Sequence, residues 1–259
     1  MNSDNKSVDL YDCPVYYEVA FGFRDLSKEV DFFEECIKTF SKIPVKKVLD
    51  VGCGPCPYMT ELVKRGYIFS GLDLSKAMLD YSLEKAQKAD IRIETIHADM
   101  RNFTVDEKFD FVFCMLGSIS IESNKQFLSH LDSVANCLRN GGIYLVDASI
   151  NFDWTQLGRQ EWTVAEDGLT LNIVWEQELV NLIKQLVIDR VMVKAVGKDG
   201  EKLFKTEKVE KIIFPQEFLE LVKGNSKFEF LGWYNNFSLD EPLEKAKSTN
   251  RPITLLRRK

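Results

Sequence analysis

The sequence predicts an α/β protein: a mostly parallel sheet with helices on both faces, into which a smaller antiparallel β subdomain is inserted. Between residues 47 and 148, short apolar runs alternate with segments of helical period, which is typical of parallel strands joined by helices. Between residues 161 and 214, strand-like runs follow one another with few helix signals. Residues 215–259 return to a helix and two strands. We therefore expect seven strands in the main sheet.

The composition limits the partners that this protein can have. A chain of 259 residues that is 45% hydrophobic can bury a sizeable core. The net charge of −6, and the lack of basic clusters before Arg257-Arg258-Lys259, predict no nucleic-acid partner. The polar stretch from Met1 to Leu10 does not resemble a signal peptide, and no apolar run has the length of a membrane span. We therefore expect a cytoplasmic protein with reduced cysteines and no membrane partner.

The first 150 residues contain the alternating part of the pattern. Residues 1–12 are expected to be mobile, and an amphipathic helix is expected at 27–40 with Ser27 as its cap. The expected strands that follow are 47–51, 67–74, 91–98, 109–116 and 143–148. The expected helices between them are 57–65, a helix capped by Ser75, and 124–138, which Asn140-Gly141-Gly142 ends.

The second part of the chain is predicted to be mainly antiparallel. Turn residues such as Glu166-Asp167-Gly168 separate most of its apolar runs. A helix follows, with Pro215 near its start. The expected strands are 161–166, 169–180, 183–196 and 202–214 before that helix (215–223), and 228–234 and 252–257 after it.

Acidic residues follow three successive strands at the edge where a parallel sheet forms its ligand crevice. The first strand runs into Asp50-Val51-Gly52-Cys53-Gly54, whose glycines permit a tight turn that exposes backbone N–H groups. Asp73 ends the next strand, 21 residues after Gly52, where a carboxylate accepts hydrogen bonds from ribose hydroxyls. Asp99 ends the third strand, beside Met100, and can accept from an exocyclic adenine amine. Together the three acids indicate an adenosine ligand.

These stretches resemble the class I S-adenosylmethionine-dependent methyltransferases. The resemblance implies a Rossmann-like methyltransferase fold, S-adenosylmethionine as the cofactor, and methyl transfer to a nitrogen or oxygen of a small-molecule acceptor. The chain departs from the family at Cys56, where a third glycine is frequent, and we expect a tighter turn there. The motifs that carry the likeness are Asp50-Val51-Gly52-Cys53-Gly54, Gly71-Leu72-Asp73-Leu74-Ser75, Ala98-Asp99-Met100-Arg101, Phe109-Asp110-Phe111-Val112 and Leu138-Arg139-Asn140-Gly141-Gly142.

The aromatic leader from Tyr16 to Asp25 and the late β insertion look like the branch related to glycine N-methyltransferase and the amino-sugar N,N-dimethyltransferases. By that likeness Tyr17 and Phe21 cover the cofactor, and Arg24 meets its carboxylate. The hydroxyl of Tyr16 or Tyr17 would act in catalysis by orienting the acceptor amine or the methyl group. The cofactor-binding residues that the resemblance implies are Phe21, Arg24, Asp50, Gly52, Gly54, Asp73, Leu74, Met78, Asp99, Met100, Cys114, Met115 and Leu116.

The same likeness implies a division of the chain into three parts. Residues 1–150 would form an N-terminal cap and the S-adenosylmethionine-binding core. Residues 151–214 would form the β insertion, as an acceptor cap or a homodimer contact. Residues 215–259 would return to the core. Four tryptophans in or beside the late sheet would line an acceptor pocket or pack in the sheet: Trp154, Trp162, Trp175 and Trp233.

Several alternatives remain open from the sequence. A non-catalytic regulatory protein that binds the same cofactor or S-adenosylhomocysteine would carry the same motifs. The pair Cys53 and Cys56 has the spacing of a thiol–disulfide motif, although a glycine-rich strand end precedes it. A nicotinamide site is disfavoured because Pro57 stands where Gly-x-Gly-x-x-Gly requires glycine. No metal is expected, because no second close pair of Cys or His completes a zinc site. The leader aromatics would also suit a plain core.

Overall fold

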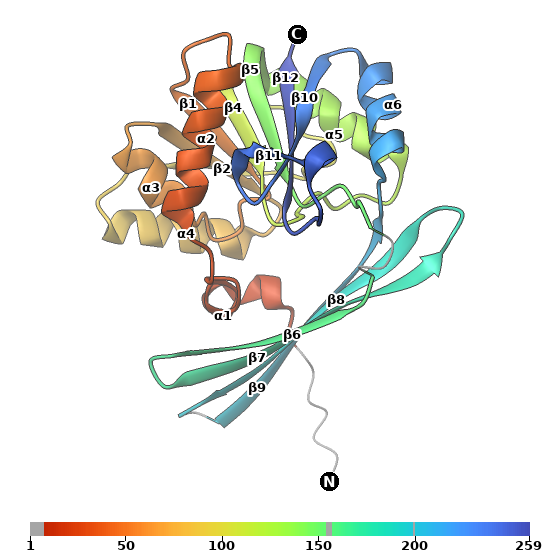
Figure 1. The fold of residues 1–259 in the computed structure, drawn as a ribbon. Helices are drawn as coiled ribbons and strands as arrows, with labels where there is room; N and C mark the ends of the chain where they lie inside the picture. Colours follow the sequence, from red (N-terminus) through yellow and green to blue (C-terminus); the bar gives the residue numbers. More distant parts are fainter. Residues whose placement is uncertain (1–7, 154–156, 199) are drawn as a thin grey trace.

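The protein folds into two sheets of different size. The computed structural model describes residues 8–153, 157–198 and 200–259 (Figure 1). An eight-stranded sheet with helices on both faces forms the larger part, and a four-stranded antiparallel sheet lies at one end of it. The predicted fold class is therefore confirmed. None of the helices in the described residues is both long enough and apolar enough to span a bilayer.

The large sheet has the order β11-β10-β12-β5-β4-β1-β2-β3. Strands β1 to β5 pair in parallel, and the other three join the sheet antiparallel. The sheet has one strand more than predicted, because the polar run from Ser238 to Pro242 pairs along the edge of β10. The strands are β1 (Lys47–Val51), β2 (Ile68–Asp73), β3 (Glu94–His97), β4 (Phe109–Cys114), β5 (Leu138–Asp147), β10 (Phe228–Asn235), β11 (Ser238–Pro242) and β12 (Pro252–Arg258).

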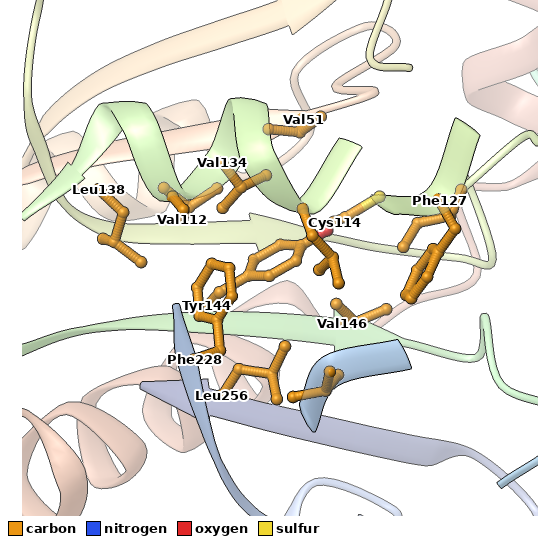
Figure 2. Close-up of a cluster of buried hydrophobic side chains, with 14 of the residues drawn as sticks. Val51, Val112, Cys114, Phe127, Val134, Leu138, Tyr144, Val146, Phe228 and Leu256 are labelled. Atoms are coloured by element: carbon orange, nitrogen blue, oxygen red, sulfur yellow. The ribbon is translucent and has the colours of Figure 1, made fainter. Parts of the chain in front are cut away.

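Two apolar cores lie on opposite faces of the large sheet. Neighbouring strand residues point to opposite faces, so Leu49 of β1 lies in one core and Val48 in the other. Figure 2 shows the first core, where Phe127 and Val134 of α5 pack near Tyr144 of β5. The helices are α5 (Asn124–Cys137) and α6 (Pro215–Asn225) over the first core, and α2 (Leu26–Phe40), α3 (Met59–Lys64) and α4 (Lys76–Lys88) over the second.

Side-chain caps define where two of these helices begin. The carboxylate of Asp25 accepts from the backbone N–H of Lys28 at 3.1 Å, so Asp25 caps α2. The prediction that Ser27 is the cap is wrong, because Ser27 already lies within the helix. Ser75 caps α4 as predicted, since its hydroxyl accepts from the N–H of Met78.

The segment Asn140-Gly141-Gly142 was expected to end a helix, and this is wrong. Helix α5 stops at Cys137, and β5 begins at the next residue. Leu138 already pairs with Phe109 of β4. The glycines therefore lie within the strand, because sheet pairing begins before they are reached.

The antiparallel sheet faces the end of the core where the parallel strands terminate, with α1 (Pro14–Ala20) between the two sheets (Figure 1). Its order is β6-β7-β8-β9. A third apolar cluster joins α1 to the inner face of this sheet, with Ala20 and Ile173 among its buried residues. The strands are β6 (Arg159–Glu166), β7 (Leu169–Asn181), β8 (Leu186–Gly197) and β9 (Gly200–Lys211).

Part of the leader that was expected to be mobile is ordered. Val8 bridges to Phe204 of β9, and Leu10–Asp12 forms a short 3-10 helix. The side chain of Leu10 is buried in the cluster between α1 and the antiparallel sheet. Burial of this leucine accounts for the order, which the polar neighbouring sequence does not suggest. Residues 1–7, which the same expectation covered, lie outside the described part.

Candidate active site

The turn after β1 has the backbone geometry that its glycines were expected to provide. Gly52 and Gly54 have φ angles of 74° and 51°. The N–H groups of Gly52 and Cys53 both donate to the carbonyl of Leu72, at 2.8 and 3.0 Å. A Cβ on Gly52 would lie 2.7 Å from Cε of Met100. Glycine is therefore required here both by the backbone conformation and by close packing.

Asp73 joins this turn to the end of β2. Its Oδ2 accepts from the N–H of Gly54, and its Oδ1 accepts from the N–H of Ser75, both at 2.8 Å. Burial raises the pKa of the Asp73 carboxyl, and the hydrogen bonds from the backbone oppose that effect. Each carboxylate oxygen retains a lone pair for a second donor. The side chain therefore holds the turn and can also accept from a ligand.

The other two strand-end acids have different surroundings. Asp50 is 2% exposed within β1, and burial raises its pKa well above the usual range, with Arg24 opposing the effect. Asp99 forms a bidentate pair with Arg101, with Nη2 2.6 Å from Oδ2, and the hydrogen bonds from Arg101 lower the pKa of Asp99. Only Asp99 is therefore held in its charged form by a cationic neighbour.

Arg24 lies close to the glycine turn and has an unused donor. Its Nη1 donates to the hydroxyl of Tyr58 at 3.0 Å, and its guanidinium lies 5.2 Å from the centre of the Tyr58 ring. Its Nε is buried and has no hydrogen-bond partner among the described residues. A buried donor without a partner is costly, so this site suits an acceptor group from a ligand.

The leader tyrosines point in different directions. A Cβ on Gly54 would lie 3.7 Å from the ring of Tyr17, and Tyr17 packs on Phe21 with 4.7 Å between ring centres. Tyr16 instead packs on Phe204 of β9, and its hydroxyl accepts from Lys202 at 3.3 Å. The structure thus brings Tyr17 and Phe21 to the glycine turn and leaves Tyr16 against the antiparallel sheet. The expectation that Tyr16 lies with Tyr17 at the reacting groups is not met.

The three expected cofactor-binding residues at the end of β4 and just after it lie in different surroundings. Cys114 is fully buried in the core drawn in Figure 2, and Met115 is buried in the opposite core. Leu116 has a φ angle of 54°, and its N–H donates to Oδ2 of Asp147 at 2.8 Å. Of the three, only Leu116 faces an open space. Cys114 therefore packs in the core, which does not match the expectation that it binds the cofactor.

Two further expected residues flank the start of α4. Leu74 is 61% exposed, whereas Met78 is fully buried in the protein interior. The carbonyl of Leu74 lies 2.9 Å from Nε2 of His97. Leu74 is thus accessible beside the crevice.

Met100 lies over Gly52, and its carbonyl oxygen is 2.8 Å from Nδ1 of His130.

A cavity of about 950 Å³, here called the inter-sheet pocket, lies between the strand ends of the large sheet and the inner face of the antiparallel sheet. Tyr17, Phe21 and Leu116 line it near the glycine turn, and Trp162 and Trp175 line it from the antiparallel sheet. The pocket therefore lies beside the glycine turn, with Tyr17 between them. Further lining comes from residues 117–119, 148–152 and 249–252.

Trp233 does not line this pocket. Trp233 lies in β10 and packs on Phe230, with 4.5 Å between ring centres. It is 8% exposed and belongs to the core between the large sheet and α5 and α6. Trp154 lies outside the described residues.

Three charged side chains of the antiparallel sheet form one wall of the inter-sheet pocket, and we call them the Asp189–Lys208–Glu210 cluster. Asp189 and Lys208 are directly opposite in the pairing of β8 and β9. The Lys208 ammonium lies 2.6 Å from Oε1 of Glu210. Oδ2 of Asp189 accepts from Nε1 of Trp175 at 3.1 Å and from Nε2 of Gln177 at 3.0 Å.

Sequence reasoning missed this cluster. Asp189 and Glu210 are 7% and 9% exposed, at inward-facing positions of β8 and β9, and Asp189 interrupts a face of β8 that is otherwise apolar. Burial raises the pKa of Glu210, and Lys208 opposes the effect. The available signal was the carboxylate of Asp189, which interrupts the apolar alternation of β8. The inward face could not be identified until the pairing of the strands was known.

The Cys53 and Cys56 side chains pack together in the protein interior. A Cβ on Gly71 would lie 2.8 and 2.7 Å from their sulfur atoms. Burial raises the pKa of the Cys53 thiol well above its usual value, which is the opposite of the activation that a redox cysteine requires. The loop closes at Cys56 with a φ angle of 48°, and the N–H of Cys56 donates to Cys53. The structure thus favours a packing role for both thiols.

Known proteins resemble this chain in the region of the glycine turn and beyond. A family model described as a methyltransferase domain matches residues 48–142. The putative methyltransferase YqeM of Bacillus subtilis is 24% identical over 210 residues, which cover 80% of this chain and 83% of that protein. A putative methyltransferase of a Geobacillus strain is 26% identical over 139 residues, and the match spans 51% of this chain and only 56% of that protein.

Solved structures share the whole fold. An S-adenosylmethionine-dependent methyltransferase from Clostridium acetobutylicum has a TM-score of 0.77 at 21% identity, covering 94% of this chain and 96% of that one. The sugar N-methyltransferase KedS8 from a Streptoalloteichus species has a TM-score of 0.74 at 17% identity, covering 100% and 96%. The chain thus contains a methyltransferase domain match over residues 48–142, and its whole fold is that of a solved S-adenosylmethionine-dependent methyltransferase. The amino pentose methyltransferase CalS10 from Micromonospora echinaspora, solved with bound S-adenosylmethionine, has a TM-score of 0.72 at 16% identity, covering 94% of this chain and 97% of that one.

Replacing Gly52 with alanine is expected to lower cofactor affinity about tenfold. The new Cβ would enter the space between Met100 and Ser118, at 2.7 and 3.1 Å, and the φ angle of 74° costs a side chain about 1 to 2 kcal/mol. Calorimetric titration with S-adenosylmethionine measures the effect. Gly224→Ala is the control, because no atom lies within 4 Å of its Cβ position. Wild-type affinity in Gly52→Ala would contradict a role for this turn in binding.

Proposed function

We propose that this methyltransferase acts on an amine nitrogen of a small, polar metabolite that binds in the inter-sheet pocket. The observation that carries the proposal is the Asp189–Lys208–Glu210 cluster on the pocket wall. Two buried carboxylates face one ammonium group there, so the cluster has one formal negative charge in excess when both carboxylates are ionised. Such a wall favours an ammonium group and disfavours an anionic acceptor. The volume of about 950 Å³ suits a small metabolite.

We propose that the cofactor lies along the glycine turn, with its methionine part toward the pocket. Asp73 would accept from the ribose hydroxyls, and Gly52 and Gly54 would admit the methionine part. Arg24 would bind the carboxylate, which is supported by its buried Nε without a partner among the described residues. Asp99 would face the adenine amine through lone pairs that Arg101 does not use.

Further residues would enclose the cofactor. Tyr17 and Phe21 stack beside the turn and would cover it, and Leu116 would lie near the methyl group. The neighbours Asp50, Leu74, Met78, Met100 and Met115 would support the site from the strands and from α4. We leave Tyr16 and Cys114 out of the proposed site, because Tyr16 packs on β9 and Cys114 in the core.

When bound, S-adenosylmethionine would supply the methyl group, which is bonded to a sulfonium sulfur that leaves readily as a neutral thioether. The protein therefore has to align the acceptor and exclude water. Tyr17 lines the pocket and also contacts the glycine turn, so it lies at the junction of the two sites. Burial raises the pKa of Tyr17, which keeps its hydroxyl protonated and able to donate a hydrogen bond. The raised pKa of Glu210 would allow that carboxylate to receive a proton from an acceptor ammonium.

A titration with matched acceptors tests the proposal. Hydroxylated ring compounds that carry a primary amine are compared with the N-acetyl, hydroxyl and carboxylate forms of the same rings, in the presence of S-adenosylhomocysteine. Trp162 and Trp175 line the pocket, so quenching of tryptophan fluorescence reports occupancy. The amines are expected to bind most tightly and to yield S-adenosylhomocysteine when incubated with S-adenosylmethionine. Equal binding and turnover of the hydroxyl forms would instead support an oxygen acceptor.

Asp189→Asn is expected to weaken amine binding by about ten- to a hundredfold, since a hydrogen bond to a charged group contributes roughly 1.5 to 3 kcal/mol. Glu178→Gln is the matched control, because Glu178 is exposed on the outer face of β7 and pairs with Arg190. Cofactor affinity is expected to stay unchanged in both variants. An unchanged amine affinity in Asp189→Asn would contradict the role of the cluster.

A further inference from the structure

Arg251 lies immediately before β12 and joins two buried carboxylates. Its Nη2 is 2.7 Å from Oδ2 of Asp147, and its Nη1 is 2.8 Å from Oε1 of Glu29. The two acids are 0% and 4% exposed. The guanidinium also lies 4.6 Å from the centre of the Phe237 ring. A planar guanidinium can serve both carboxylates at once, whereas an ammonium group has no such fork.

The first carboxylate, that of Asp147, is connected to residues that line the inter-sheet pocket. Oδ2 of Asp147 accepts from the N–H of Leu116 at 2.8 Å, and the backbone carbonyl of Asp147 accepts from the N–H of Gly117 at 3.0 Å. Leu116 has a φ angle of 54°, which is unfavourable for a leucine unless its surroundings hold it. Asp147 therefore fixes the strained turn that lines the pocket, and Arg251 fixes Asp147.

The second carboxylate, that of Glu29, is connected to Arg24 beside the glycine turn. The hydroxyl of Tyr58 donates to Oε2 of Glu29. The same hydroxyl accepts from Nη1 of Arg24 at 3.0 Å. A hydroxyl group can donate one bond and accept another, so the three side chains form an ordered series. Arg251 is thus connected to Arg24 through Glu29 and Tyr58.

The charges of the network leave Arg24 available to a ligand. Arg251 has two carboxylate partners, whereas within the described part of the chain no carboxylate lies within ion-pair distance of Arg24. We propose that Arg251 is a positioning residue, which holds Arg24 at the methionine end of the cofactor and Leu116 at the pocket mouth in one fixed relation. This inference rests on the proposed function, because it takes Arg24 as the residue that binds the cofactor carboxylate.

The test compares two ligands that differ in the methionine part. S-adenosylhomocysteine carries the amino-acid carboxylate, and 5′-methylthioadenosine has the adenosine part without it. Arg251→Lys is expected to weaken S-adenosylhomocysteine binding about tenfold or more in calorimetric titration, and to leave 5′-methylthioadenosine within about twofold. Hydrogen exchange at the amides of Leu116 and Gly117 is expected to become faster. A residue with a general structural role would weaken both ligands alike.

Arg257→Lys is the matched control, since Arg257 lies near the other end of β12 and pairs with Glu229 outside the network. Glu29→Gln cuts the same series at its middle and should show the same split between the ligands, which keeps the test valid if Arg251→Lys unfolds. Equal loss for both ligands, or wild-type affinity for S-adenosylhomocysteine, would overturn the inference. If the wild-type protein bound neither ligand, the proposed function would fail first.

Discussion

Asp73→Ala is expected to lower the affinity for S-adenosylmethionine by at least about a hundredfold. The carboxylate holds the N–H groups of Gly54 and Ser75 at 2.8 Å, and we propose that it also accepts from the ribose. Each hydrogen bond to a charged group contributes roughly 1.5 to 3 kcal/mol, so loss of the ribose contacts alone accounts for the expected effect. The loss of the two backbone contacts would add to it by loosening the turn. Calorimetric titration measures the change.

Asp80→Ala is the control for this substitution. Asp80 lies on the surface of α4, where it pairs with Lys76 of the same helix. Its removal is expected to leave both affinity and melting temperature unchanged. Circular dichroism of Asp73→Ala shows whether the variant remains folded. A folded Asp73→Ala protein with wild-type affinity would remove the ribose assignment.

The free energy of unfolding is expected to fall by about 3 kcal/mol through His130 as the pH is lowered from 7 to 4. Burial lowers the pKa of this histidine from 6.5 to about 4. The unfolded chain therefore binds a proton between these values while the folded protein does not, and stability rises with pH in that window. This difference between the pKa of His130 in the unfolded and the folded protein corresponds to about 3 kcal/mol of unfolding free energy. Urea unfolding at several pH values measures the effect.

His130→Gln is expected to remove this part of the pH dependence. In the wild type, the ring nitrogens of His130 lie 2.8 Å from the carbonyl of Met100 and 2.6 Å from the hydroxyl of Tyr144. The stability difference between wild type and variant should therefore grow as the pH rises from 4 to 7. His97→Gln is the control, because His97 is exposed at the end of β3. A constant difference across the range would show that His130 does not titrate as inferred.

Much of the fold was predictable because its cause is local. Alternation of apolar runs and amphipathic segments defined the helices and most strands, since burial on both faces requires that pattern. The strand β11 and the cap Asp25 were missed. β11 is polar and depends on its partner strand, and two capping residues two positions apart cannot be distinguished without the backbone. The cytoplasmic location, the homodimer contact, the absence of a nucleic-acid partner and the three-part division remain predictions.

The glycine turn after β1 is the part of the candidate site that the sequence by itself determined. Gly52, Gly54 and Asp73 lie at strand ends, where position in the chain dictates position in the crevice. The tertiary structure alone decided that Tyr17 faces the turn while Tyr16 does not, because the two differ by one helical position. It alone revealed the Asp189–Lys208–Glu210 cluster and the ion pairs of Arg251, because these side chains meet only through strand pairing and loops distant in the sequence.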